Sequence, residues 1–145
     1  MKKIVIVGAL GYLGTELCKI YSGESWLNKI VAIDSRFASE RVSQLKDWNI
    51  EFFQGHIFDL DFLKKHLKDA DIVHHLAGVT DVAYVKKESG SELDEKIRAT
   101  AIDGTNNILD SIPEKCKIIF PSTHVIFEGY KETKLDIDEI EKPKP

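Results

Sequence analysis

The stretch GALGYLG, from Gly8 to Gly14, follows directly on the β-branched run KKIVIV. A strand-to-helix turn explains one glycine, but three glycines at three-residue intervals, with Gly11 in the middle, predict a turn that cradles phosphate groups. One glycine permits the bend, one lets the backbone approach a ligand, and one lets helix and strand pack closely. The following helix would add free N–H groups and a partial positive charge. No lysine followed by serine or threonine comes after the glycines, which disfavours a nucleoside triphosphate loop.

Strand-like and helix-like segments alternate along the chain. Continuous apolar runs, typical of strands in a buried parallel sheet, occur at residues 2–7, 29–34, 50–55, 70–78 and 116–122. Helical periodicity occurs at residues 11–22, 39–48, 59–69 and 91–111. This alternation predicts right-handed βαβ units and therefore an α/β fold with a doubly wound parallel sheet, a Rossmann fold. We expect the strand order 3-2-1-4-5, with a ligand crevice at the carboxyl edge where strands 1 and 4 diverge.

The helical segments carry apolar residues at helical spacing, and the first helix should pack back on the sheet. In the first helix these are Leu13, Leu17, Ile20 and Tyr21. In the third helix they include Phe62, Leu63 and Leu67, and Asp59 or Asp61 is placed to cap it. In the fourth helix they are Leu93, Ile97, Ala101, Ile108 and Leu109.

Size and composition limit the classes of protein to be considered. The 145 residues suffice for one domain with a substantial core. We expect it at residues 1–129, followed by a charged, proline-containing tail at residues 130–145. The net charge of −4 argues against a nucleic-acid or anionic-membrane partner. There is no apolar run of membrane-spanning length, no signal-peptide pattern and no metal-type cysteine spacing, so we expect a cytoplasmic protein with reduced thiols.

An acidic residue ends the second expected strand. Asp34 lies 20 residues beyond Gly14. A carboxylate there can accept both ribose hydroxyls of adenosine and repel a 2′-phosphate, which favours NAD over NADP. Helix capping or turn formation is the alternative role for Asp34. Arg36, two residues later, could stack on adenine or bind a 2′-phosphate.

These motifs resemble those of the extended short-chain dehydrogenase/reductases, the family of NAD-dependent nucleotide-sugar epimerases and dehydratases. GALGYLG is similar to the family's GxxGxxG, GHIFD to its adenine-flanking segment, and HHLAGVTDV to its fourth-strand motif. AIDGTNNIL is similar to the helix motif NVxGTxNLL, and IIFPSTHVIFEG to the fifth-strand motif SSxxVYG. The resemblance implies NAD as cofactor and a nucleotide sugar as substrate. It places the following residues along NAD: Gly8, Gly11, Tyr12, Leu13, Gly14, Asp34, Ser35, Arg36, His56, Ile57, Leu76, Ala77, Gly78 and Thr80.

The chain departs from the family pattern at two positions. His56 replaces the usual aspartate of the adenine-flanking segment, so the resemblance leaves adenine contact to Ile57 and the backbone. Ala101 replaces the asparagine that opens the helix motif, which removes one polar support of the site.

The resemblance also places Thr123 at the family's catalytic Ser/Thr position. The family's base is a tyrosinate whose pKa is lowered by a lysine four residues later on one helix. Tyr130 and Lys134 have that spacing, but they follow Thr123 by only seven residues in a polar segment, so we interpret them as a chance match. The family's tyrosine would then lie beyond Pro145. A neighbouring histidine, His124, could also be considered as a base, but we favour a structural role for it.

Two functions remain open on this reading. The chain would be the amino-terminal, cofactor-binding part of an oxidoreductase or isomerase, ending before the YxxxK helix, and 145 residues alone should not catalyse. The alternative is a non-catalytic module that binds or senses NAD. A reading frame that continues to a downstream YxxxK would favour the enzyme, and a stop codon the module. The sequence leaves a homodimer open.

Two adjacent histidines lie on the fourth expected strand. Because successive side chains of a strand point to opposite faces, His74 and His75 cannot bind one metal ion together. We interpret both as packed strand histidines, and no metal site is expected.

Overall fold

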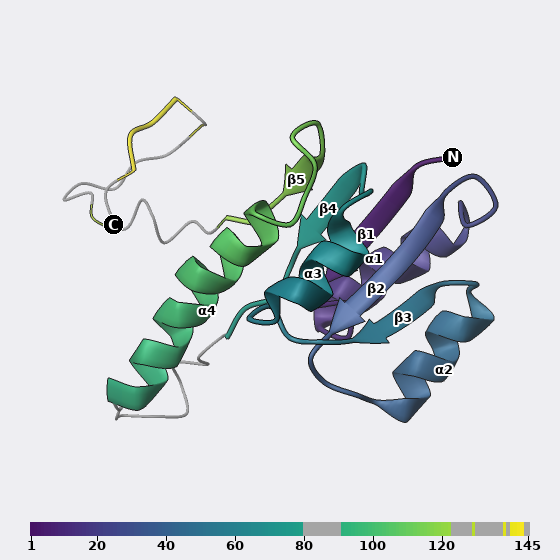
Figure 1. The fold of residues 1–145 in the computed structure, drawn as a ribbon, viewed down its shortest axis with the longest axis horizontal. Coiled ribbons are helices and arrows are strands. Elements are labelled where there is room, and N and C mark those ends of the chain that lie inside the picture. Colours follow the sequence, from purple (N-terminus) through teal and green to yellow (C-terminus); the bar gives the residue numbers. More distant parts are fainter. Residues whose placement is uncertain (80–90, 123–128, 130–137, 139, 144–145) are drawn as a thin grey trace.

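The computed structural model of the chain describes residues 1–79, 91–122, 129, 138 and 140–143. Five strands form one parallel sheet in the order β3-β2-β1-β4-β5 (Figure 1). The strands are β1 (Lys3–Val7), β2 (Lys29–Asp34), β3 (Glu51–Gln54), β4 (Ile72–His75) and β5 (Lys117–Ile119). The predicted fold class and strand order are therefore confirmed.

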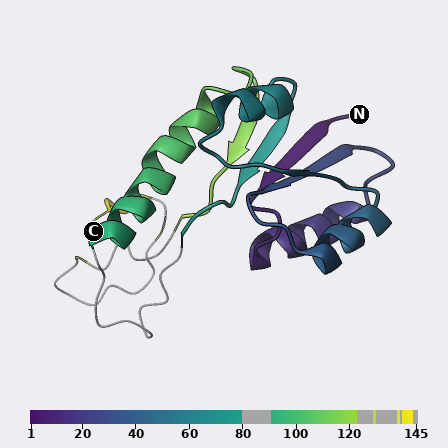
Figure 2. The ribbon, with the colours of Figure 1, turned by 60° about the horizontal axis from the view of Figure 1, so that its bottom comes forward.

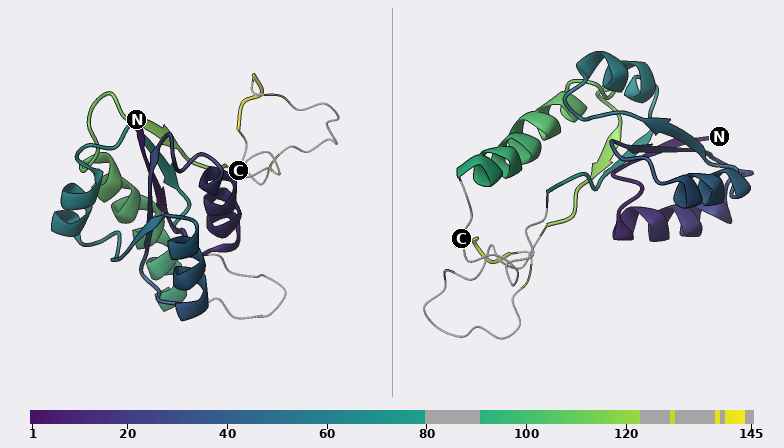
Figure 3. Two further views of the ribbon diagram at one scale, coloured as in Figure 1. Left: turned by 90° about the vertical axis from the view of Figure 1, so that its right-hand side faces the viewer. Right: turned by 90° about the horizontal axis from the view of Figure 1, so that it is seen from below.

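Helices cover both faces of the sheet. On one face lie α1 (Tyr12–Ser22) and α2 (Ser39–Asp47), and on the other lie α3 (Leu60–Leu67) and α4 (Ser91–Leu109) (Figure 2 and Figure 3). This is the arrangement that right-handed crossovers produce when the chain first moves outward from β1 and then returns to β4. Among the described residues, no helix is both long and apolar enough to cross a membrane.

The core has two halves because alternate strand residues point to opposite faces. Val5, Val7 and Val73 pack against α3 and α4, whereas Ile4, Ile6 and Ala32 pack against α1 and α2. The central strand β1 is buried on both faces, with every residue from Ile4 to Val7 at most 3% exposed. A continuous β-branched run is what such a position requires, which explains why this strand was readable from the sequence.

The buried side of α1 differs from the prediction. Gly14 and Cys18 face the sheet, whereas Leu13 and Ile20 are 59% and 67% exposed. The prediction that these two apolar residues are buried was therefore wrong. The physical reason is close approach: a Cβ on Gly14 would lie 2.3 Å from the Gly8 carbonyl oxygen, so α1 must turn its glycine toward the strand end. Leu17 and Tyr21 pack partly against the core, as predicted.

The other helices agree better with the sequence. Asp59 caps α3, since its carboxylate accepts the Phe62 N–H at 2.9 Å, and Leu63 is fully buried. In α4, Ile108 is fully buried, whereas Leu109 is 46% exposed and Ala101 is also exposed. Ala101 lies about two turns before Ile108 on the same helix. Leu109 neighbours Ile108 and points away from the core.

Candidate functional site

The turn between β1 and α1 contains three glycines with different surroundings. Gly8 has a φ of +88°, and a Cβ there would lie 2.7 Å from the backbone nitrogen of Ala77. A Cβ on Gly14 would lie still closer to backbone atoms. Both positions need glycine for the fold itself. Gly11 is less constrained, because its φ is −72° and the nearest described atom to a Cβ would be the Gly8 carbonyl oxygen at 3.2 Å, a tight contact that a shift of a few tenths of an ångström relieves.

The amino terminus of α1 opens at this turn. Gly11 is its N-cap residue and offers no side chain to the first-turn N–H groups, and no acidic residue occurs in that turn. Tyr12 and Leu13, in the first turn of α1, are 82% and 59% exposed. Uncapped N–H groups together with the helix dipole favour an anion at this position.

Asp34 ends β2 beside the glycine turn, and its carboxylate is only 5% exposed. Its Oδ2 accepts the N–H of Leu10 at 2.9 Å. Its Oδ1 accepts the backbone N–H of Arg36 at 3.0 Å and Nε of the same residue at 3.2 Å. The turn-forming role that the sequence left as an alternative is thus present, and the carboxylate also ties β2 to the glycine turn. Contact with a ribose stays a prediction. Next to it, Ser35 is exposed.

A second arginine reaches the glycine turn from α2. Arg41 Nη1 donates to the carbonyl oxygen of Leu10 and lies 3.4 Å from Thr15 Oγ1 in the first turn of α1. The sequence analysis missed Arg41, because nothing in a nine-residue amphipathic helix identifies a partner 31 residues earlier in the chain.

The carboxyl end of β4 forms the opposite side of the turn. The Leu76 N–H donates to the Val7 carbonyl oxygen at 2.8 Å, which continues the β1–β4 pairing by one residue. Ala77 is the residue that leaves no room for a side chain at Gly8. Gly78 is exposed, and a Cβ there would meet no described atom within 4 Å. The structure therefore brings together the glycine turn, Asp34 and residues 76–78 at one edge of the sheet.

The loop after β3 carries the residues predicted to flank adenine. His56 is exposed and accepts the Phe58 N–H on Nδ1 at 3.2 Å. Ile57 is 5% exposed and packs in the core, so most of its side chain is committed to the fold. Its carbonyl oxygen accepts Nδ2 of Asn107 at 3.0 Å, and a Cβ on Gly104 would lie 2.2 Å from its Cδ1. Helix α4 thus fixes the position of this loop.

The two strand histidines point to opposite faces, as predicted. His74 Nε2 lies 2.9 Å from the Tyr21 hydroxyl of α1, and His75 Nε2 lies 2.9 Å from Thr105 Oγ1 of α4. Burial lowers the pKa of both imidazoles below the usual histidine value. Within the described part of the chain, His75 Nδ1 has no hydrogen-bond partner.

Two predicted site residues, Thr80 and Thr123, lie outside the described residues, as do His124, Tyr130 and Lys134. Their roles stay predictions. Ser122, beside Thr123, is described and exposed.

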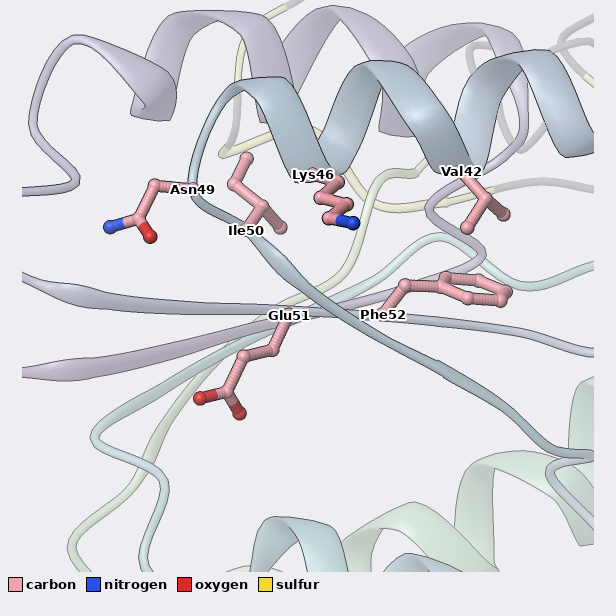
Figure 4. Close-up of a pocket in the computed structure, with 6 residues that line it drawn as sticks. All are labelled: Val42, Lys46, Asn49, Ile50, Glu51 and Phe52. Carbon is pink, nitrogen blue, oxygen red and sulfur yellow. The ribbon is translucent and has the colours of Figure 1, made fainter.

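A surface pocket lies elsewhere, between α2 and the amino end of β3 (Figure 4). Val42 and Lys46 of α2 point toward Phe52, while Glu51 points to the opposite side of the strand. In a parallel sheet the amino end of β3 lies at the edge opposite the glycine turn, so this pocket is not part of the candidate site.

Comparisons of sequence with known proteins agree on one group of enzymes. A profile of the 3-beta hydroxysteroid dehydrogenase/isomerase family matches residues 5–144. The dTDP-D-glucose 4,6-dehydratase of Dictyostelium discoideum is 29% identical over 136 residues, which cover 88% of this chain and 30% of that protein. The chain spans about 30% of the length of the curated relatives that it matches.

The similar solved structures include two nucleotide-sugar epimerases. UDP-glucuronic acid 4-epimerase from Bacillus cereus, in complex with UDP-glucuronic acid and NAD, is 26% identical with a TM-score of 0.75, covering 99% of this chain and 46% of its own. UDP-glucose 4-epimerase from Bifidobacterium longum, in complex with NAD+ and UDP, has a TM-score of 0.79 at 16% identity, covering 99% and 43%. The second likeness concerns the fold alone.

Proposed function

Because the chain belongs to the 3-beta hydroxysteroid dehydrogenase/isomerase family, we propose that it binds NAD at the glycine turn and is the cofactor-binding part of an oxidoreductase. This membership agrees with the resemblance to extended short-chain dehydrogenase/reductases. The observation that carries the proposal is Gly11. Unlike Gly8 and Gly14, it has an ordinary φ, and a Cβ there would make a tight contact of 3.2 Å with the Gly8 carbonyl oxygen and not an overlap. A glycine that crowding within the fold explains only in part, next to an uncapped helix terminus, is what close approach of a pyrophosphate needs.

Each described element of the site has a role in this proposal. The first-turn N–H groups of α1 hold the pyrophosphate, Asp34 accepts from the adenosine ribose, and residues 76–78 run along the cofactor. NAD, when bound, supplies the hydride acceptor or donor. Residues 1–129 form the cofactor domain, and residues 130–145 lead out of it.

The binding proposal is tested by calorimetric titration of NAD into the protein and its Gly11→Val variant. We expect the variant to fold and to lose measurable NAD binding, because two methyl groups would stand where the pyrophosphate approaches the backbone. Gly23→Val is the matched control: Gly23 has a φ of −66° at the far end of α1, and a Cβ there makes ordinary contact at 3.6 Å. Unchanged affinity in Gly11→Val would reject the proposal.

The substrate is proposed from the relatives. The Dictyostelium dehydratase and the Bacillus epimerase act on nucleotide sugars by name, so we propose hydride transfer at a sugar carbon. The family description instead names a 3β-hydroxysteroid. Both substrates are secondary alcohols. Incubation of the full-length gene product with NAD and each of UDP-glucuronic acid, dTDP-glucose and a 3β-hydroxysteroid decides between them. An epimerase or dehydratase returns the hydride to the sugar, so the sugar product is measured, whereas oxidation of the steroid is measured as NADH.

Thr123 is proposed as the catalytic hydroxyl, which donates a hydrogen bond to the reacting oxygen. In the full-length gene product, Thr123→Val should lower kcat by about 10- to 100-fold with little change in KM, the size expected for one lost transition-state hydrogen bond. Tyr130→Phe is the control, and its rate should stay within about twofold. A normal kcat in Thr123→Val would mean that another residue, first of all Ser122, supplies the catalytic hydroxyl. A large loss in Tyr130→Phe would make that tyrosine the base.

The alternative proposal is a non-catalytic module that binds or senses NAD. Both proposals expect Gly11→Val to lose NAD binding, but only the enzyme is expected to turn over a substrate. If the full-length gene product binds NAD but converts none of the three substrates, whether followed by sugar product or by NADH, the module is favoured.

A further inference from the structure

The last residue of β4 is joined to α4 by a hydrogen bond. His75 ends β4, and its Nε2 lies 2.9 Å from Thr105 Oγ1 of α4. The imidazole is only 1% exposed, and its Nδ1 has no hydrogen-bond partner among the described residues. If the contact with Thr105 were lost, both ring nitrogens would be buried without a described partner, which is costly. Loss of this bond should therefore shift the ring and the end of the strand that carries it.

The residues that follow β4 are packed against the glycine turn. The Leu76 N–H donates to the Val7 carbonyl oxygen at 2.8 Å. A Cβ on Gly8 would lie 2.7 Å from the Ala77 backbone nitrogen, so the two backbones are in close contact. A small shift at the end of β4 therefore changes how this segment fits against the turn.

Helix α4 contacts two parts of the candidate site with two different side chains. Ile108 is fully buried in the core, and Thr105 and Asn107 lie on either side of it on the helix surface. Asn107 Nδ2 donates to the Ile57 carbonyl oxygen in the loop after β3, whereas Thr105 contacts the end of β4. One stretch of α4 thus contacts both the loop after β3 and the end of β4.

The order of the strands determines which part of a dinucleotide each contact would affect. In the proposed function, Asp34 at the end of β2 binds the adenosine ribose, and the glycine turn after β1 binds the pyrophosphate. The next strand of the sheet beyond β1 is β4. The second half of the dinucleotide would therefore continue over the carboxyl end of β4.

We propose that the hydrogen bond between Thr105 and His75 positions the carboxyl end of β4 for the nicotinamide half of NAD. The inference rests on the proposed binding of NAD at the glycine turn. Thr105 and His75 are positioning residues, because they act through residues 76–78 and do not contact the cofactor themselves. Asn107, by contrast, acts on the loop predicted to flank adenine, so the two side chains of α4 affect different halves of one ligand.

The test compares the dissociation constants of NAD and ADP, measured by calorimetry. ADP contains the adenosine and pyrophosphate groups of NAD but lacks its nicotinamide half. Thr105→Val keeps the shape of the side chain and removes the hydroxyl group. NAD binding should weaken about tenfold, the size of one lost hydrogen bond, while ADP binding changes by less than about twofold. Thr105→Ser keeps the hydroxyl group and should bind NAD within about twofold of the unmutated protein. Asn106→Ala, exposed on the same helix, is the control and should change neither constant.

A second variant removes the same hydrogen bond from the other side. His75→Phe should also weaken NAD binding and leave ADP binding unchanged, and urea denaturation shows how much of each variant is folded. If both variants bind NAD normally, or if NAD and ADP weaken by the same factor, the inference is overturned, because a general loss of structure affects both ligands alike. If the unmutated protein binds neither ligand, the proposed function itself fails.

Discussion

Gly14 and Gly78 are both glycines of the candidate site, yet a methyl group would find very different surroundings at the two positions. A Cβ on Gly14 would overlap backbone atoms of the turn, whereas one on Gly78 would meet no described atom within 4 Å. We predict that Gly14→Ala lowers the free energy of unfolding by about 1–3 kcal/mol, because helix and turn must move apart. Gly78→Ala should stay within about 0.5 kcal/mol. Urea denaturation of both variants measures this difference. Equal free energies of unfolding would contradict the close backbone contact at Gly14.

The positions and contacts of individual site residues could be predicted only in part from the sequence. The glycine spacing and the acidic residue at the end of β2 predicted the place of the site, because a strand, a tight turn and a helix leave few positions for them. The bond between Asp34 and the Leu10 N–H could not be predicted, since these residues meet only through the fold, and the same holds for Arg41 and the Leu10 carbonyl oxygen. Local spacing carries no signal for such long-range partners.

At the scale of elements, α4 positions the loop that follows β3. Asn107 donates to the Ile57 carbonyl oxygen, and the absence of a side chain at Gly104 makes room for Ile57. Both belong to the segment AIDGTNNIL, which the sequence analysis noted without assigning a task to either residue. A helix motif can thus position a loop that it does not itself form, here the loop predicted to flank adenine.

The link between α4 and this loop is testable. Asn107→Ala should lower the free energy of unfolding by about 1 kcal/mol, since it leaves a largely buried carbonyl oxygen without its donor. It should also speed amide hydrogen exchange in residues 55–59 and weaken NAD binding. Asn106→Ala is the matched control, because this neighbouring asparagine is exposed on the same helix. If exchange in the loop is the same in both variants, Asn107 does not hold it.

Strand positions were predicted more reliably than helix faces. Continuous apolar runs sufficed for β1 and β2, whose sides are both buried. In α1, however, apolar residues occur on most sides of the helix, so periodicity did not select one. The close contact of Gly14 with the turn decides which side is buried, and it leaves Leu13 and Ile20 outside. Steric fit between elements, and not hydrophobic pattern, sets this orientation.

For the molecule as a whole, the parallel sheet unites residues from distant parts of the chain. Every β-strand ends at the same edge, so the turn after β1, Asp34 after β2 and residues 76–78 after β4 become neighbours. The same topology places histidines between the sheet and the helices that cover it. His74 and His75 lie within the sheet, and His66 of α3 packs between the rings of Phe53 and Phe62.

These histidines predict how the stability of the whole molecule depends on pH. Burial lowers the pKa of His66, His74 and His75, so below about pH 6.5 the unfolded chain binds protons that the native chain does not. The free energy of unfolding should therefore be constant from pH 8 to pH 7 and fall as pH drops from about 6.5 to 5. Each histidine adds at most about 1.4 kcal/mol per pH unit. Contact with Lys3 keeps the pKa of Asp69 below its usual range, so that carboxylate stays ionised in this window.

Urea denaturation at half-unit steps of pH measures this slope, and His75→Phe isolates one contribution to it. Phenylalanine keeps a ring beside Phe120, whose centroid lies 5.0 Å from that of His75, but it takes up no proton. The variant loses the contact with Thr105 at every pH, so its absolute stability is not the readout. Its slope between pH 6.5 and 5 should be smaller than that of the unmutated protein. An equal slope would show that His75 is protonated as readily in the native state as in the unfolded chain. That result would contradict the lowered pKa expected from its burial in the sheet.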